Sequence, residues 1–302
     1  MGKTKANNYC RNRDLLQVGN VDQVLAEIRE IVALIAPGFD YSLVAEVSRD
    51  LIRLYKGDYP GYAASNTKYH DLAHTCAVVL ALVRLVHGMH IVGSTFSLRV
   101  LELGVLAAFF HDTGLLPETH DIEGTGAKHM IGHEQRSNAL MGDYLTSHGL
   151  SPLDIKECRQ MIDCTILQTS PADLDFTCEE VKRMGFILGT ADLVAQMGDP
   201  CYLEKLPRLY MEFQEAGITG YESSLDLFKK TGDFYTLVAL KRFNEYFDGV
   251  IRYMPHHFHA RWGIEEDLYA ISIQNQIQYL KVIADACKES YPCLIANLRR
   301  KV

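Results

Sequence analysis

The chain has 302 residues, of which 48% are hydrophobic and 23% are charged, so it can bury the core of one large domain or of two small ones. Its net charge of −8 and isoelectric point near 5.8 argue against a general binder of nucleic acid or of anionic membrane surfaces. No secretory signal is visible, and no stretch reaches the roughly 18 apolar residues of a membrane span. We therefore expect a cytoplasmic protein.

The eight cysteines form no CxxC pair. Several of them occupy apolar-face positions of helical stretches, which favours buried reduced thiols over a disulfide framework or a zinc knuckle. The cysteines are Cys10, Cys76, Cys158, Cys164, Cys178, Cys201, Cys287 and Cys293.

Apolar residues recur at helical spacing through the first third of the chain. Residues 1–20 are polar and are expected to form a mobile arm, and helices are predicted over 21–36 and 40–56. A further helix should begin near Asn66, as its N-cap, and continue to about residue 87.

The next predicted helix, 97–111, is apolar almost all round and should lie in the core. Residues 112–126 contain three Gly and one Pro, which indicates a loop. No alternating strand pattern of convincing length follows. The sequence predicts one all-α domain of roughly ten helices over 21–302. The later helices are predicted over 128–148, 152–168, 179–197, 202–216, 223–253 and 266–288.

Three short motifs bring together imidazole and carboxylate side chains. His70 and His74 are four residues apart, so on a helix they would share one face. His111 and Asp112 close the predicted core helix, where a carboxylate is disfavoured by the helix dipole unless a cation lies nearby. Asp192 lies in the apolar run GFILGTADLVAQM, where it would be costly without a partner. Such a set suits a hard or borderline divalent metal.

The ordered set H…HD…D resembles the signature of the HD-domain metal-dependent phosphohydrolases. The piece YHDLAH also resembles the YHNxxH motif of the class I cyclic-nucleotide phosphodiesterases. The motifs lie within residues 65–200, and the C-terminal helices over 202–302 would cover the core and the substrate pocket. The resemblance implies a helical HD/phosphodiesterase-like fold and a first metal held by His74, His111, Asp112 and Asp192.

The same resemblance implies a mechanism. Asp112 would reach a second metal with its other oxygen, a metal-bound hydroxide would attack a phosphate ester, and His70 would protonate the leaving alkoxide. One or two divalent ions are expected, and Mn²⁺, Mg²⁺, Zn²⁺, Fe²⁺ and Ni²⁺ all suit the ligand set. The alternatives are a surface position for His70 and a buried ion pair with an arginine for Asp192.

A second metal site would use residues beyond the loop. His133 is the candidate ligand, Glu134 could orient a ligand or a water, and Asp163 stands where a histidine would be more usual. The alternatives are a solvated helix face for His133 and Glu134 and a hydrogen bond within a helix for Asp163.

The candidate cations for a substrate phosphate are Lys128, Arg136 and Arg261. The neighbouring histidines His256, His257 and His259 should point in different directions on an extended or turn segment, which favours a surface or rim position. Phe258 and Trp262 are expected in core packing.

The chain departs from the cyclic-nucleotide enzymes at several positions. Asp71 replaces the expected Asn, Ala77 replaces an expected Asp, and HDTGLL lacks the HDxDH continuation. The proposed substrate is a small phosphodiester such as a cyclic nucleotide, with no nucleic-acid polymer and no membrane as partner. The alternatives are a nucleoside mono- or triphosphate hydrolase, a non-catalytic HD-fold module and an HD-fold iron oxygenase. The oligomeric state is left open.

Overall fold

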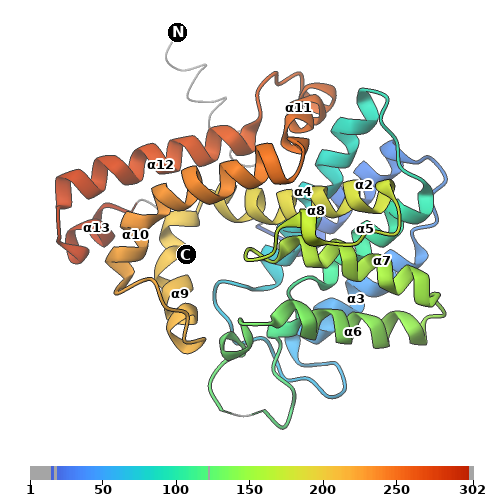
Figure 1. Ribbon diagram of the computed structural model, residues 1–302, viewed down its shortest axis with the longest axis horizontal. Coiled ribbons are helices and arrows are strands. Elements are labelled where there is room, and N and C mark those ends of the chain that lie inside the picture. Colours follow the sequence, from blue (N-terminus) through green and yellow to red (C-terminus); the bar gives the residue numbers. More distant parts are fainter. Residues whose placement is uncertain (1–14, 17–18, 122, 299–302) are drawn as a thin grey trace.

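The computed structural model describes residues 15–16, 19–121 and 123–298 (Figure 1). This part of the chain is 71% helical, with twelve α-helices and no strand, which confirms the all-α prediction. An isolated antiparallel bridge joins Tyr62 to Glu118.

Most of the predicted helices begin and end within a few residues of their expected bounds, because helical periodicity identifies the segments that pack on the core. The predicted segment 223–253 differs, because it begins as α10 and continues into two π-helical turns, Phe234–Ala239 and Arg242–Tyr246. The α-helices are α2 Val21–Ile35, α3 Ser42–Lys56, α4 Leu72–Ile91, α5 Leu98–Phe110, α6 His133–Ser147, α7 Pro152–Ile162, α8 Glu179–Gly198, α9 Tyr202–Glu215, α10 Ser224–Asp233, α11 Met254–Trp262, α12 Leu268–Cys287 and α13 Tyr291–Asn297.

Helix α4 lies at the centre of the molecule and packs against α2, α5, α8 and α11. By length and composition it could cross a membrane, contrary to the expectation from sequence, but 83% of its most apolar window is buried inside the protein. The close approach of α11 is possible because residue 88 is glycine. A Cβ there would lie 1.9 Å from the carbonyl oxygen of Tyr253. Helix α4 is therefore the core element on which the other helices are assembled.

The N-terminal arm is only partly described, since residues 1–14 and 17–18 lie outside the described residues. Leu15 and Leu16 do not fit the expectation of a mobile arm. Leu16 is 8% exposed and belongs to the hydrophobic core, and the carbonyl of Leu15 accepts a hydrogen bond from the buried guanidinium of Arg84 at 2.8 Å.

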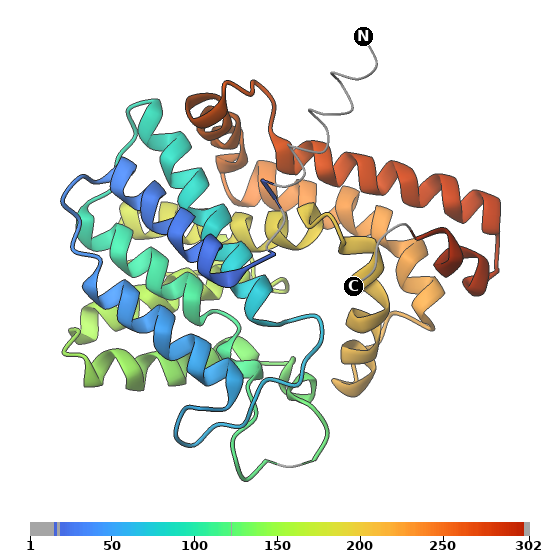
Figure 2. The same cartoon turned by 180° about the vertical axis from the view of Figure 1, so that it is seen from behind.

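The C-terminal helices cover one side of α8, on which α12 packs, and α12 runs beside the α10 segment in both views (Figure 2). A disulfide joins Cys287 to Cys293 and links α12 to α13, so the prediction of reduced thiols was wrong for this pair. It was right for three others, which are the buried thiols Cys76, Cys158 and Cys164. Cys10 lies outside the described residues.

The segment HHFHARWG is helical, so the expected turn was wrong. His257 on α11 is fully buried, and its Nδ1 lies 3.1 Å from Nδ1 of His87 on α4. Its ring also contacts Trp262 edge-on, with the ring centres 5.4 Å apart. The expectation of a surface or rim position was therefore wrong for His257, while Phe258 packs in the core as predicted.

Candidate metal centre and adjoining cavity

Four of the predicted ligands converge from α4, α5 and α8. Nε2 of His74 lies 3.4 Å from Oδ2 of Asp112 and 3.3 Å from Oδ1 of Asp192. Nε2 of His111 lies 3.2 Å and 3.9 Å from the same two oxygens. Adjacent ligands of one metal ion at bond lengths near 2.1 Å would be about 3.0–3.4 Å apart. Three of the four distances lie in that range. The ligand atoms of His74, His111 and Asp112 all lie within 4.8 Å of one another, so these three side chains can share one ion, with Asp192 beside His74.

The hydrogen bonds around the cluster leave ligand atoms without partners. Nδ1 of His111 donates to the carbonyl of Ala108 at 2.8 Å, which directs its Nε2 lone pair toward Asp112. Nε2 of His111 and Oδ2 of Asp112 are both buried without a hydrogen-bond partner. Buried polar atoms are rarely left unpaired, and a backbone carbonyl behind a ligating histidine is the usual support for a metal site. The residues present therefore fit a divalent metal.

The second carboxylate oxygen of Asp112 faces a third histidine. Oδ1 lies 3.2 Å from Nε2 of His133, the first residue of α6, whose Nδ1 donates to the carbonyl of Met130 at 2.8 Å. Asp112 thus presents one oxygen to each of two histidine groups. Glu134 places Oε2 3.5 Å from Nδ1 of His133 and is itself buried. Asp112 and His133 could therefore hold a second divalent ion.

Helix α6 fixes the chain that follows Asp112. The hydroxyl of Ser137 donates to the carbonyl of His111 at 2.6 Å and accepts from the amide of Gly114 at 2.8 Å. A Cβ at Gly114 would lie 2.0 Å from the carbonyl oxygen of His133, so only glycine allows this approach. Arg136 donates to the carbonyl of Gly114 at 2.8 Å. These contacts between α6 and the segment after Asp112 keep His133 close to His111 and Asp112.

His70 lies before α4 rather than within it. The side chain of Asp71 caps the helix by accepting from the amide of His74 at 2.9 Å, and the predicted cap Asn66 instead accepts from Gly126 at 2.8 Å. The rings of His70 and His74 nevertheless lie edge to face, with centres 5.8 Å apart. The expected shared helix face was wrong, but the two rings are neighbours.

A buried carboxylate from α9 holds His70. Nδ1 of His70 lies 2.7 Å from Oε2 of Glu212, which is 4% exposed, and Oε1 accepts from the amides of Lys68 and Tyr69 at 2.7 Å each. Burial alone would lower the pKa of His70, but Glu212 and Asp112 raise it above its ordinary value. The ring is thus fixed with Nε2 as its remaining proton site.

The electrostatics of the cluster favour positive charge at its histidines. Burial opposes the charge of His111, but the adjacent Asp112 raises its pKa to about 9. Burial also opposes the charge of His133, but Asp112 raises its pKa to about 9 as well. Burial would raise the pKa of Asp112, but the histidines lower it well below its ordinary value. Since ligands must be deprotonated, a metal ion would have to displace these protons.

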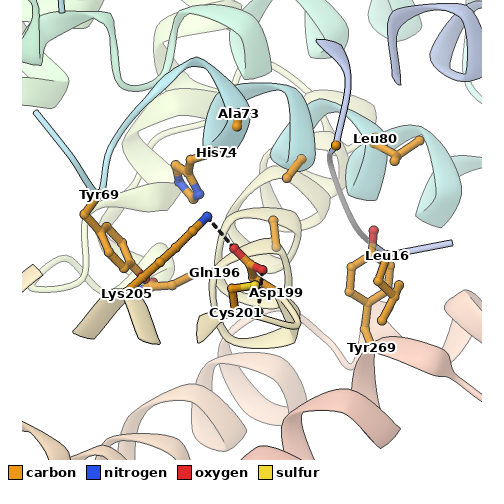
Figure 3. A pocket seen from close by; sticks show the side chains of 13 residues that line it. Leu16, Tyr69, Ala73, His74, Leu80, Gln196, Asp199, Cys201, Lys205 and Tyr269 are labelled. Carbon is orange, nitrogen blue, oxygen red and sulfur yellow. Dashed lines mark hydrogen bonds and ion pairs between the residues drawn. The ribbon is translucent and has the colours of Figure 1, made fainter. Parts of the chain in front are cut away.

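The cluster is open on one side. His111 is 1% exposed at its side chain, whereas Asp192 is 20%, His70 17% and His133 16% exposed. A cavity of about 310 Å³ adjoins His74 and lies between α4, α8, α9 and α12 (Figure 3). Of the candidate metal ligands, His74 is the one that lines this cavity.

The remaining predicted site residues lie elsewhere or are already paired. Lys128 pairs with Asp121, and Asp163 accepts a hydrogen bond from Asn138 at 2.9 Å. Arg136 supports the loop after Asp112, as described above. Arg261 binds Glu27 and Glu30 on α2, at 3.1 Å and 2.7 Å.

Arg261 is also remote from the cluster. Helix α11 packs at Gly88, which along α4 is about 20 Å from His74. The structure therefore does not bring this predicted phosphate ligand to the metal ligands.

Two residues near the cluster were missed by the sequence interpretation. Glu212 lies among Leu206, Leu209 and other buried residues of amphipathic α9, so an acidic residue on an apolar helix face was the available signal. Lys205, which lines the cavity, had no such signal, because its surroundings come from three other helices.

The model of the Npun_R2479-like family matches residues 120–273, which is just over half of the chain. The matched range includes His133, Asp192 and Glu212 but not His74, His111 and Asp112. The search of curated proteins finds no match for this chain.

Proposed function

The chain belongs to the Npun_R2479-like family, and we propose that it is a metal-dependent phosphohydrolase of the HD-domain type that cleaves a small phosphodiester such as a cyclic nucleotide. The observation that carries the proposal is the position of Asp112. One of its oxygens faces His74 and His111, the other faces His133, and two of these ligand atoms are buried without partners.

The ligands would be His74, His111, Asp112 and Asp192 for one ion, and Asp112 and His133 for another. A bound divalent ion would supply charge stabilisation for the phosphoryl oxygens and lower the pKa of a water molecule. Phosphoryl transfer asks for little more from a protein than positioning and charge stabilisation.

The chain itself supplies the leaving-group proton. Glu212 accepts the Nδ1 proton of His70, so the proton available for transfer is at Nε2. This proton would pass to the departing alkoxide oxygen as its bond to phosphorus breaks. The raised pKa of His70 keeps the donor form populated near neutral pH, which suits a poor leaving group.

The test compares bis(p-nitrophenyl) phosphate with p-nitrophenyl phosphate, using Mn²⁺-loaded protein and a chelator-stripped control. Diester cleavage that the chelator abolishes supports the proposal. Preference for the monoester would instead favour a nucleotidase. Turnover of neither ester, with metal still bound, would count against a phosphohydrolase, and oxygen consumption by the iron-loaded protein would then indicate an oxygenase.

A further inference from the structure

The cavity beside His74 has the size and lining of a small-molecule site. Its volume of about 310 Å³ is at the lower end of the range for ligand pockets. It follows α4 from Ala73 to Leu80, a length of about 10 Å. Tyr269 on α12 lines it together with Ala77 on α4. A flat apolar group would fit this part, while the other part adjoins a metal ligand.

Lys205 is the one lysine or arginine among the described residues that line this cavity. Its side chain extends into the cavity from α9 with its ammonium next to Asp199, as Figure 3 shows. Nζ donates to Oδ2 of Asp199 at 2.5 Å, and Oδ1 of Asp199 accepts from the amide of Cys201 at 2.8 Å. Asp199 therefore holds the ammonium at a fixed place, and only one of the three N–H donors of Lys205 is used in this pair.

Lys205 differs from the predicted phosphate cations in its position in the cavity and not in its pairing, because Asp199 is its counter-charge. The protein is acidic overall, and the predicted phosphate cations Lys128 and Arg261 are bound to carboxylates of their own. Lys205 lines the same cavity as His74 and is 18% exposed at its side chain. A substrate that reaches the metal ligands through this cavity passes beside it.

We propose that Lys205 binds an anionic oxygen of the substrate, and that the cavity takes a nucleotide-sized phosphate ester with its flat apolar part against Ala77, Leu80 and Tyr269. The inference rests on the proposed function, because the phosphate is placed between Lys205 and the ligand His74. It identifies Lys205 as a residue that determines specificity and Asp199 as the counter-charge with which the substrate oxygen competes.

The test measures binding of adenosine 5′-monophosphate and of adenosine to Mn²⁺-loaded protein by titration calorimetry. Lys205→Met should weaken binding of the monophosphate by about tenfold or more while adenosine changes by less than about twofold, since only the former carries the anion. Asp199→Asn should leave monophosphate binding as tight or tighter, because it frees the ammonium from its counter-charge.

A purely structural ion pair would respond to both substitutions with the same sign. Weaker monophosphate binding in both variants, unchanged binding in Lys205→Met, or no binding by the wild type would overturn the inference. Lys230→Met is the matched control, because Lys230 pairs with Asp226 at 2.8 Å on the surface of α10. Circular dichroism checks folding, and if Lys205→Met does not fold, the Asp199→Asn result decides.

The two proposals can fail separately. Binding of the monophosphate that depends on Lys205, without hydrolysis of either chromogenic ester, would support the cavity inference and reject the phosphohydrolase. Metal-dependent hydrolysis with monophosphate binding unchanged in Lys205→Met would support the phosphohydrolase and reject the cavity inference.

Discussion

Nδ1 of His70 lies 2.7 Å from Oε2 of Glu212, although the two residues are 142 positions apart in the chain. The other oxygen of this carboxylate binds the amides of Lys68 and Tyr69. Helix α9 thus fixes the short segment that precedes α4, and with it the ring that we propose as the proton donor.

Replacing His70 by alanine should separate metal binding from turnover. We expect His70→Ala to retain the metal and to lose activity by about 100-fold or more for esters with alkoxide leaving groups, since these need a proton. Esters of p-nitrophenol should be affected less. Rates measured across a series of leaving groups test this, and equal rates for variant and wild type on an alkyl ester would exclude His70 as the general acid.

Replacing Glu212 by glutamine should change the pH dependence of the reaction. Burial lowers the pKa of His70 and Glu212 raises it, so the variant should have the lower pKa. Activity that requires protonated His70 is lost as pH rises through this pKa, and in Glu212→Gln that loss should occur at lower pH. The kcat profile against pH measures the shift, with metal content as the control. An unmoved profile would reject the positioning role.

Removing His111 should remove the metal. His111→Ala deletes a ligand whose Nε2 has no other partner, so we expect metal content and activity to fall together. Elemental analysis measures the metal content, and circular dichroism checks that the variant still folds. A variant that keeps full metal content would contradict the ligand assignment. The exposed His120 offers the control variant His120→Ala, which should keep both metal and activity.

Removing His133 tests for a second ion. His133 faces the oxygen of Asp112 that points away from His74 and His111. We expect His133→Ala to lose about one equivalent of bound metal out of two while the first ion remains, because the first ligand set is untouched. Equilibrium dialysis with Mn²⁺ gives the stoichiometry. If the wild type and the variant both bind two equivalents of Mn²⁺, His133 is not a ligand of either ion.

The buried pair His87 and His257 should make the fold sensitive to acid. Burial and the nearby Arg261 lower the pKa of His87 to about 4, and burial with Arg84 lowers that of His257 to about 2. The charge of His90 also lowers the pKa of His87. Below about pH 6.5 the unfolded chain binds protons at these histidines that the folded chain does not, so the protein becomes less stable as the pH is lowered. Each histidine can raise the unfolding constant by up to about tenfold per pH unit.

A neutral substitute should reduce this sensitivity. His257→Asn removes one of the two titrations, so its stability should fall less steeply between pH 6.5 and about pH 4 than that of the wild type. Denaturant titrations at several pH values measure the slope, and fluorescence of the only tryptophan, Trp262, reports on this contact. Equal slopes for both proteins would show that His257 does not contribute.

The parts of the structure that local sequence determines were predictable. Helical periodicity located α2 and α3, and adjacency in the sequence identified His111 with Asp112 as one unit. The cap predicted for α4 was wrong. Asp71 caps the helix, while the side chain of Asn66 accepts a hydrogen bond from the amide of Gly126 in a distant loop.

The parts that depend on distant partners were not predictable from one sequence. Arg261 and Lys205 are both cations paired with carboxylates, yet Arg261 binds α2 while Lys205, paired with Asp199, lines the cavity. Their difference comes from how α9 and α11 pack, which periodicity does not determine. The same applies to His257, whose burial follows from its packing against α4.

Helix α9 carries both Lys205 and Glu212, seven residues and therefore two turns apart on one face. The first residue contacts the cavity, and the second holds the ring of His70. Both residues belong to one helix, with Pro207 between them, so a shift of the whole of α9 would displace the ammonium and the imidazole in the same movement. If the cavity binds the proposed ligand, a substitution that shifts α9 should therefore change both the affinity for that ligand and the pKa of His70.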